Sequence, residues 1–195
     1  MALLAEIHPE LRIRFSTSHP KDMTDDVLHT MARYKNICNY IHLPIQSGST
    51  AILTKMNRGY SREWYLERIK TIRKIIPDCG ISADIISGFC SETASDHQET
   101  ISLMNLVKYN FAYMFKYSER PKTLAERKYK DDVEESVKSL RLSEVIALQQ
   151  KHSLFLHKQR TGQIFEVLVE GTSKRSKDEL YGRNSQNSVV IFSKG

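Results

Sequence analysis

Cysteine is scarce in this chain, and its few copies lie far apart. The 195 residues include only three, Cys38, Cys79 and Cys90. An odd number at wide spacing excludes the disulfide framework of a small secreted domain, and no two cysteines form a Cys-x-x-Cys metal motif. We therefore predict a reducing, cytoplasmic location. Cys38 and Cys79 are expected to be buried apolar side chains, and Cys90 to be more exposed.

Long apolar runs are also missing. No run approaches the roughly 20 residues that a membrane-spanning helix needs. Residues 1–6 lack the basic flank and the long apolar core of a signal peptide. We therefore expect no membrane partner. With 40% hydrophobic and 27% charged residues, the composition suits a globular protein with one domain and part of a second.

Acidic residues are outnumbered by basic ones. The chain has 29 Lys and Arg against 23 Asp and Glu, which gives a formal net charge of +6. This balance favours a polyanionic partner such as nucleic acid, and it fits equally well a basic protein without such a partner.

Strand-like and helical segments alternate along the first part of the chain. Predicted strands begin near Leu11, Ile41, Ile81 and Phe111, and amphipathic helical patterns separate them. This alternation predicts an α/β fold with a parallel sheet and right-handed crossovers.

Two helices of the second half have signatures of their own. Ser95 and Gln98 form a predicted capping box at the start of one. The other runs from about Asp131 to Lys158, and its predicted apolar stripe consists of Val137, Leu140, Val145, Leu148 and Phe155.

The stretch from Tyr40 to Ser49 is where a predicted strand opens into polar residues. Pro44 cannot donate a hydrogen bond to a strand ladder, so it marks either a bulge or the strand's end. Gln46 begins the polar part, in which Gly48 permits close approach of a ligand and Ser49 can cap the next helix. These features fit the rim of a binding site, and they also fit an ordinary strand-to-helix turn.

Polar residues follow every predicted strand at the same relative place. They occupy positions 16–19, 46–49, 87–93 and 116–120. Because the carboxyl ends of parallel strands meet at one edge of a sheet, we expect a shared mouth for a polar ligand.

Two charged residues are further candidates for this mouth. Asp84 lies inside the third strand, where a carboxylate is costly to bury without a partner such as His42 or Arg14. It belongs either to a ligand site or to an interior cluster that sets strand register. Arg58 either reaches a ligand carboxylate or faces water.

The character of the chain changes after Gly162, where short β segments replace helices, at 164–169, 180–183 and 189–192. We assign residues 1–160 to the α/β unit and residues 161–195 to a small β module, and we expect the chain to stop inside this module. The module's basic group either holds RNA phosphates or forms a solvated loop; it comprises Lys174, Arg175, Lys177 and Arg183.

Four motifs resemble signatures of the radical SAM methylthiotransferases, in that family's order. They are Arg12–Pro20, His42–Ser49, Ser82–Gly88 and Tyr117–Pro121. The end of the chain resembles the family's TRAM domain. This version is most similar to the tRNA-modifying MiaB type and less similar to the RimO type, which modifies a ribosomal protein.

The resemblance implies part of a radical SAM (β/α) barrel that adds a methylthio group to C2 of N6-isopentenyladenosine near the tRNA anticodon. Such enzymes use S-adenosylmethionine and two [4Fe-4S] clusters. By resemblance, Gln46, Ser47, Arg58 and Asp84 would bind S-adenosylmethionine. The turn 117–120 would line the same cavity, and the TRAM basic group would hold the tRNA.

The chain also departs from the family pattern. The family's Cys-x-x-x-Cys-x-x-Cys loop and its cluster-bearing N-terminal domain are absent, and the three cysteines are too far apart to replace them. Lys122 stands where the family commonly has glycine, which would strain a turn of positive φ. We therefore predict no metal site in this chain and no activity of the chain alone.

Two other functions are open on the sequence alone. In the first, the chain is a non-catalytic fragment, which either binds tRNA or complements a separate cluster-bearing chain. In the second, it belongs to a RimO-like enzyme with a protein substrate. The basic TRAM segment argues against the last of these.

Overall fold

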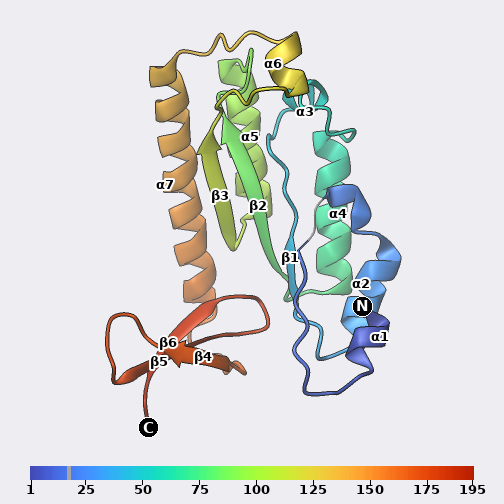
Figure 1. Ribbon diagram of the computed structural model, residues 1–195, viewed down its shortest axis with the longest axis vertical. Helices are drawn as coiled ribbons and strands as arrows, with labels where there is room; N and C mark the ends of the chain where they lie inside the picture. Colours follow the sequence, from blue (N-terminus) through green and yellow to red (C-terminus); the bar gives the residue numbers. More distant parts are fainter. Residues whose placement is uncertain (17–18) are drawn as a thin grey trace.

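The computed structural model describes residues 1–16 and 19–195 and contains two sheets (Figure 1). Three parallel strands form the first sheet in the order β1-β2-β3, and three antiparallel strands form the second in the order β4-β5-β6. Their bounds are β1 Tyr40–His42, β2 Gly80–Ser87, β3 Phe111–Lys116, β4 Leu168–Thr172, β5 Glu179–Arg183 and β6 Val189–Ser193. The parallel sheet and its helical crossovers confirm the predicted α/β class.

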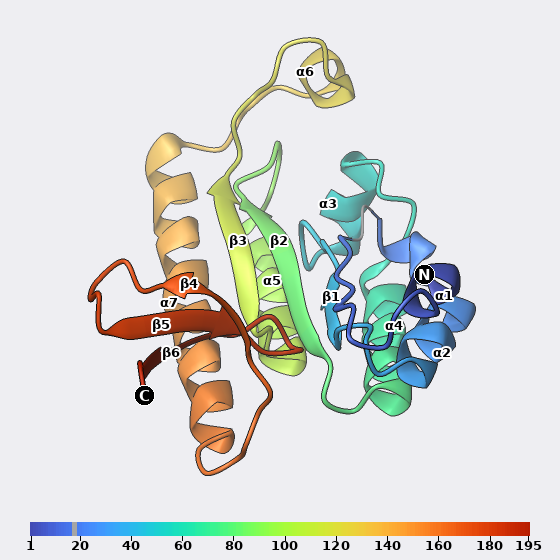
Figure 2. The same ribbon diagram turned by 60° about the horizontal axis from the view of Figure 1, so that its bottom comes forward.

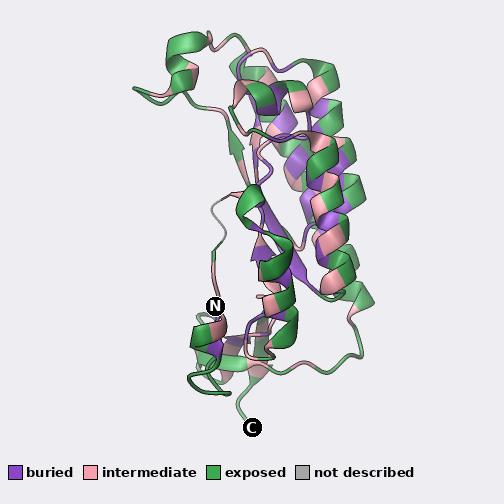
Figure 3. Cartoon of the chain, turned by 90° about the vertical axis from the view of Figure 1, so that its right-hand side faces the viewer, coloured by how far each residue is buried: buried purple, intermediate pink, exposed green. Residues whose placement is uncertain are grey.

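Helices cover one face of the parallel sheet and leave its other face open (Figure 3). On β3, Ala112 is buried against the helices, whereas Phe111 and Tyr113 on the opposite face are about half exposed, at 50% and 51%. No helix among the described residues is long and apolar enough to cross a membrane. The helices are α1 Ala2–Ala5, η1 Pro20–Asp22, α2 Asp25–Arg33, α3 Thr50–Lys55, α4 Arg62–Ile75, α5 Ala94–Val107, α6 Leu124–Lys128 and α7 Glu135–Gln159.

Polar side chains cap the first turns of several of these helices, α3, α4 and α5 among them. The hydroxyls of Ser49 and Ser61 accept the backbone N–H groups of the first turns of α3 and α4. The capping box predicted at Ser95 and Gln98 is wrong. The box consists of Thr93 and Asp96, two residues earlier, because each of their side chains accepts the other's backbone N–H.

The strand predicted at residues 11–15 is also wrong, since this segment forms only a single parallel bridge between Ile13 and Ile37. The reason is that Arg12 and Arg14 turn away to the small sheet. Their guanidinium groups donate to the backbone carbonyls of Arg183 and Asn184, at 2.8 and 2.7 Å.

The apolar stripe predicted on the long helix lies partly on the wrong face. Leu140 and Phe155 are exposed. Val145 is buried as predicted, but the other side chains that α7 buries are polar or charged, namely Lys138, Arg141, Gln149 and His152. Each of these side chains has at least one partner, at Asp131, Glu92, Tyr109 and Asn105 respectively, which lowers the penalty that burial of a polar group carries. Part of the penalty stays, because Gln149 Oε1 and His152 Nδ1 are buried without a hydrogen-bond partner among the described residues.

A second small core lies at the carboxyl end of the parallel sheet. It consists of Ile52, Phe89 and Cys90, with Tyr117 and Tyr129 packed against it. Cys90 is fully buried, so the prediction that it is more exposed than Cys38 and Cys79 is wrong: all three thiols are buried. The aromatic rings around position 90 cover it.

The small antiparallel sheet lies at the amino end of the parallel sheet (Figures 1 and 2). The turn between β5 and β6, residues 184–188, makes the contact. Ser185 Oγ accepts the N–H of Asn39 at 2.8 Å, and Gln186 donates to Asp78 at 2.9 Å. Gly80 permits this approach, because a Cβ there would lie 2.7 Å from the carbonyl oxygen of Gln186.

Candidate functional site

The carboxyl ends of β2 and β3 border a cavity of about 580 Å³. The described side chains that line it include Gln46, Asp84, Phe115, Tyr117 and Arg120. Three of the predicted strands thus deliver polar residues to one hollow, as the parallel arrangement requires.

Gln46 enters this cavity in an unusual backbone conformation. Its φ is +73°, a left-handed value that costs a non-glycine residue free energy. Two backbone hydrogen bonds to β2 hold it there: its N–H donates to Asp84 O, and its carbonyl accepts from Ile86 N, both at 2.8 Å. Strain of this kind, kept by surrounding bonds, is typical of a functional position.

Asp84 projects from the middle of β2 beside Gln46. Its carboxylate lies 3.5 Å from His42 Nε2, so one of its two predicted partners is confirmed. The second is wrong, because Arg14 binds the turn between β5 and β6 instead. His42 is oriented by a 2.8 Å contact between its Nδ1 and Ser82 Oγ. The carboxylate stays partly exposed to the cavity.

Tyr117 carries an unpartnered polar atom at the same place. Its hydroxyl is buried and has no hydrogen-bond partner among the described residues. Burial raises the pKa of Tyr117, and the neighbouring Cys90 adds to the rise. The ring packs edge-on against Phe89, with 4.8 Å between centroids, and Lys138 Nζ lies 5.5 Å from its centroid. The hydroxyl is therefore neutral and lies buried next to the Cys90 thiol, at the edge of the cavity.

Arg58 borders a second hollow of about 390 Å³, which shares Gln46 and Tyr117 with the first. Its Nε donates to Tyr60 Oη at 3.2 Å, and its Nη2 lies 3.4 Å from Pro44 O. The guanidinium is thus fixed at the rim, and it does not simply face water.

Ser47 does not line either hollow. It is fully buried, and its hydroxyl accepts the N–H of Ser49 at 3.2 Å and contacts Thr100 Oγ1 at 3.5 Å. Ser47 therefore shapes the turn, while its neighbour Gln46 faces the cavity. Of the predicted rim at 16–19, Thr17 and Ser18 lie outside the described residues, and His19 Nε2 contacts Arg58 O at 3.2 Å.

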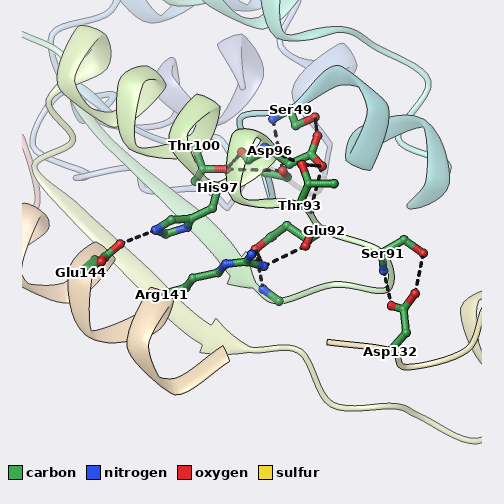
Figure 4. Close-up of polar contacts among 12 residues, drawn as sticks. Ser49, Ser91, Glu92, Thr93, Asp96, His97, Thr100, Asp132, Arg141 and Glu144 are labelled. Atoms are coloured by element: carbon green, nitrogen blue, oxygen red, sulfur yellow. Dashed lines mark hydrogen bonds and ion pairs between the residues drawn. The ribbon is translucent and has the colours of Figure 1, made fainter. Parts of the chain in front are cut away.

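A buried ion pair between Glu92 and Arg141 holds the loop after β2 (Figure 4). Glu92 accepts the Gly88 N–H at 3.0 Å and the Arg141 guanidinium at 2.9 Å. Burial raises the pKa of Glu92, while these two donors oppose the rise by stabilising its carboxylate. Sequence reasoning missed this pair, because Arg141 lies 49 residues further along the chain, on α7.

The predicted basic group lies at the other end of the molecule. Lys174, Arg175 and Lys177 are exposed on the connection between β4 and β5. Arg183 is separate from them, on β5, where its Nε lies 3.3 Å from a Glu170 carboxylate oxygen. The group and the cavity therefore lie at opposite ends of the parallel sheet (Figure 1).

The donor set that a metal cluster needs is not assembled among the described residues. No group of three or more His, Cys, Asp or Glu side chains within residues 1–16 and 19–195 lies close enough to hold a metal ion. Cys38, Cys79 and Cys90 are buried at three separate places. Burial raises the pKa of each thiol, which opposes formation of the thiolate that binds iron.

A parallel sheet with helices on one face and a polar cavity at its carboxyl edge defines an α/β protein with its ligand site at the ends of the strands. The chain matches the Radical SAM superfamily over residues 1–104 and the TRAM domain over residues 158–195. It therefore belongs to the Radical SAM superfamily, as the motifs predict.

Curated relatives share more than half of the residues. The chain is 59% identical over 193 residues to a protein of Amoebophilus asiaticus, 57% over 194 to one of Flavobacterium johnsoniae and 53% over 195 to one of Bacteroides fragilis. Each is named tRNA-2-methylthio-N(6)-dimethylallyladenosine synthase. These alignments cover 98 to 100% of this chain and 40 to 43% of the relatives, so the chain spans about two fifths of their length.

A solved structure supports the fold alone. Coproporphyrinogen III oxidase (HemN) of Escherichia coli, described as a Radical SAM enzyme, aligns with a TM-score of 0.58 at 18% identity. The alignment covers 86% of this chain and 45% of that one.

Proposed function

We propose that this chain holds S-adenosylmethionine and tRNA in an enzyme that adds a methylthio group to C2 of N6-isopentenyladenosine near the anticodon. The observation that carries the proposal is the cavity shared by Gln46, Asp84 and Tyr117. The names of the relatives support the tRNA substrate over the ribosomal protein of a RimO-like enzyme.

The residues of the cavity fit S-adenosylmethionine in size and chemistry. Its volume is within the range of small-molecule sites, roughly 300 to 1,000 Å³. Asp84 offers a carboxylate to the cofactor's ammonium group, and Arg58 and Arg120 offer guanidinium groups to its carboxylate. Phe115 supplies an aromatic surface for the adenine. Tyr117 lines the same cavity.

These residues would bind and orient the cofactor, which when bound is the source of the radical that gives this superfamily its chemistry. The described residues do not fit an iron–sulfur cluster, so they hold the cofactor without supplying the cluster's ligands. The cluster-bearing portion that the family resemblance implies would then be supplied by other residues of the whole enzyme or by a partner chain.

We propose the domain division at residues 160 and 161, with the second part gripping tRNA. The end of α7 at Gln159 and the TRAM match from residue 158 support this division. Lys174, Arg175 and Lys177 are exposed and free to contact phosphates, whereas Arg183 is engaged with Glu170.

Titration calorimetry with S-adenosylmethionine tests the cofactor site. Asp84→Asn keeps the shape of the side chain and removes its charge, so we expect affinity to fall about tenfold or more. Asp78→Asn is the matched control, because it makes the same change at the amino end of the sheet. Equal affinity of wild type and Asp84→Asn, or no binding by the wild type, would remove the proposal.

A second function follows from the poor fit of the cluster, namely a fragment that binds tRNA without chemistry. In that case the wild-type chain binds tRNA in a salt-dependent manner and shows no heat of binding with S-adenosylmethionine. The two titrations together therefore separate the two functions.

A further inference from the structure

The positive charge of this chain is concentrated in two regions. Residues 116–130, here called the mouth segment, contain six basic and two acidic residues, a net charge of +4. Residues 158–195 contain seven basic and four acidic residues, a net charge of +3. The remainder, with 16 basic and 17 acidic residues, carries −1. The mouth segment is therefore more basic than the whole TRAM region, although it has fewer than half as many residues.

The basic side chains of the mouth segment point to solvent and are largely unneutralised. Lys116 is the exception, since it pairs with Glu135. The other five make no ion pair with any described residue and are exposed; they are Arg120, Lys122, Arg127, Lys128 and Lys130. The acidic residues that follow at 131 and 132 are engaged elsewhere, with Lys138 and Ser91.

The segment is anchored, so its charges have a fixed position. Tyr117 at one side of α6 and Tyr129 at the other both pack against Phe89, at centroid distances of 4.8 and 6.3 Å. Thr123 caps α6 between them by accepting the Glu126 N–H. An anchored cluster of like charges loses less conformational freedom on binding a polyanion than a mobile loop does.

The mouth segment also borders the candidate cofactor cavity. Arg120, Thr123 and Ala125 line the larger hollow, and Leu124 lines the smaller one. The exposed residues Lys174, Arg175 and Lys177, here called the TRAM loop, lie beyond the other end of the sheet (Figure 1). The eight residues of β2 alone span about 26 Å. The two basic regions are therefore too far apart to contact the same nucleotide of an RNA.

We infer that the mouth segment is a second RNA-binding surface, which contacts phosphates of the strand that presents a base to the cavity. The inference rests on the proposed function and adds the surface that would hold RNA next to the candidate cofactor cavity. In this arrangement the TRAM loop grips RNA at a distance, while Arg127, Lys128 and Lys130 fix the strand at the cavity mouth.

Binding of an RNA stem-loop to the full 195-residue chain, measured over a salt series, tests the inference. Arg127→Gln with Lys128→Gln removes two charges outside the residues that line either hollow. We expect a loss of about 25-fold in affinity at 0.1 M salt and a salt dependence that is shallower by about 1.4, the contribution of two single-strand phosphate contacts. The control is Lys74→Gln with Lys151→Gln, two exposed lysines away from both basic regions.

Three results would overturn the inference. In the first, the mouth-segment variant keeps the affinity and salt dependence of the wild type, while the double variant Lys174→Gln with Arg175→Gln binds RNA more weakly. This result would leave the proposed RNA function intact. Another is an equal loss in the control, which would show a general effect of net charge. The third is no RNA binding by the wild type at low salt, which removes the RNA function as well. A thermal melt of each variant excludes unfolding as the cause.

Discussion

The two ends of the parallel sheet differ in how closely the rest of the chain packs against them. At the amino end, the turn between β5 and β6 meets Asn39, Asp78 and Gly80 at close range, although the buried Gln186 Oε1 there has no hydrogen-bond partner among the described residues. At the carboxyl end, the sheet borders a cavity instead, and Gln46 is held at its edge in a strained backbone conformation. The amino end is built for stability, and the carboxyl end keeps groups available for a ligand.

The largest expected effect comes from breaking the buried ion pair that holds the loop after β2 at the carboxyl end. Arg141→Met leaves Glu92 buried without its ion pair, so we expect the free energy of unfolding to fall by about 3–5 kcal/mol. Lys70→Met is the control, since its pair with Glu67 is exposed and should contribute no more than about 1 kcal/mol. Denaturant unfolding measures both, and equal losses would contradict the role given to the buried pair.

A smaller effect is expected at the amino end. Gly80→Ala would place a methyl carbon 2.7 Å from the backbone carbonyl oxygen of Gln186, so we expect the free energy of unfolding to fall by about 1–3 kcal/mol. Gly195→Ala meets nothing within 4 Å and serves as the control. A stability of Gly80→Ala equal to that of the control would show that the two sheets are not closely packed.

The smallest effect concerns the mouth segment. Lys122 has a φ of +68°, which is the left-handed backbone conformation in which a side chain is predicted to strain this turn. Lys122→Gly should raise the free energy of unfolding by about 0.5–1 kcal/mol. Lys130→Gly, at a residue without positive φ, should lower it instead. A change of the same sign in both variants would show that backbone conformation is not the cause.

Local signals explain what the sequence predicts well. Ser49 and Ser61 cap helices because a hydroxyl before an apolar run meets the free N–H groups of the first turn. Gln46, Asp84 and Tyr117 meet at one cavity because parallel strands end at one edge. Each of these inferences uses neighbours in the chain or a general rule of topology.

Features set by distant partners escape sequence reasoning. The buried face of α7 is polar, and nothing near Arg141 in the chain indicates that Glu92 will meet it. Cys90 is buried by rings that come from other elements. The basic character of the mouth segment is visible in the sequence, but its place beside the cavity depends on the packing of Tyr117 and Tyr129 against Phe89.

Backbone hydrogen–deuterium exchange, with and without S-adenosylmethionine, tests the contrast between the two ends most directly. We expect ligand-dependent protection at residues 84–92 and 117–125, at the carboxyl end of the sheet. We expect no change at residues 184–188, where the small sheet meets the amino end. Protection centred on residues 184–188, or no protection at either end, would contradict the assignment of the ligand site to the carboxyl end.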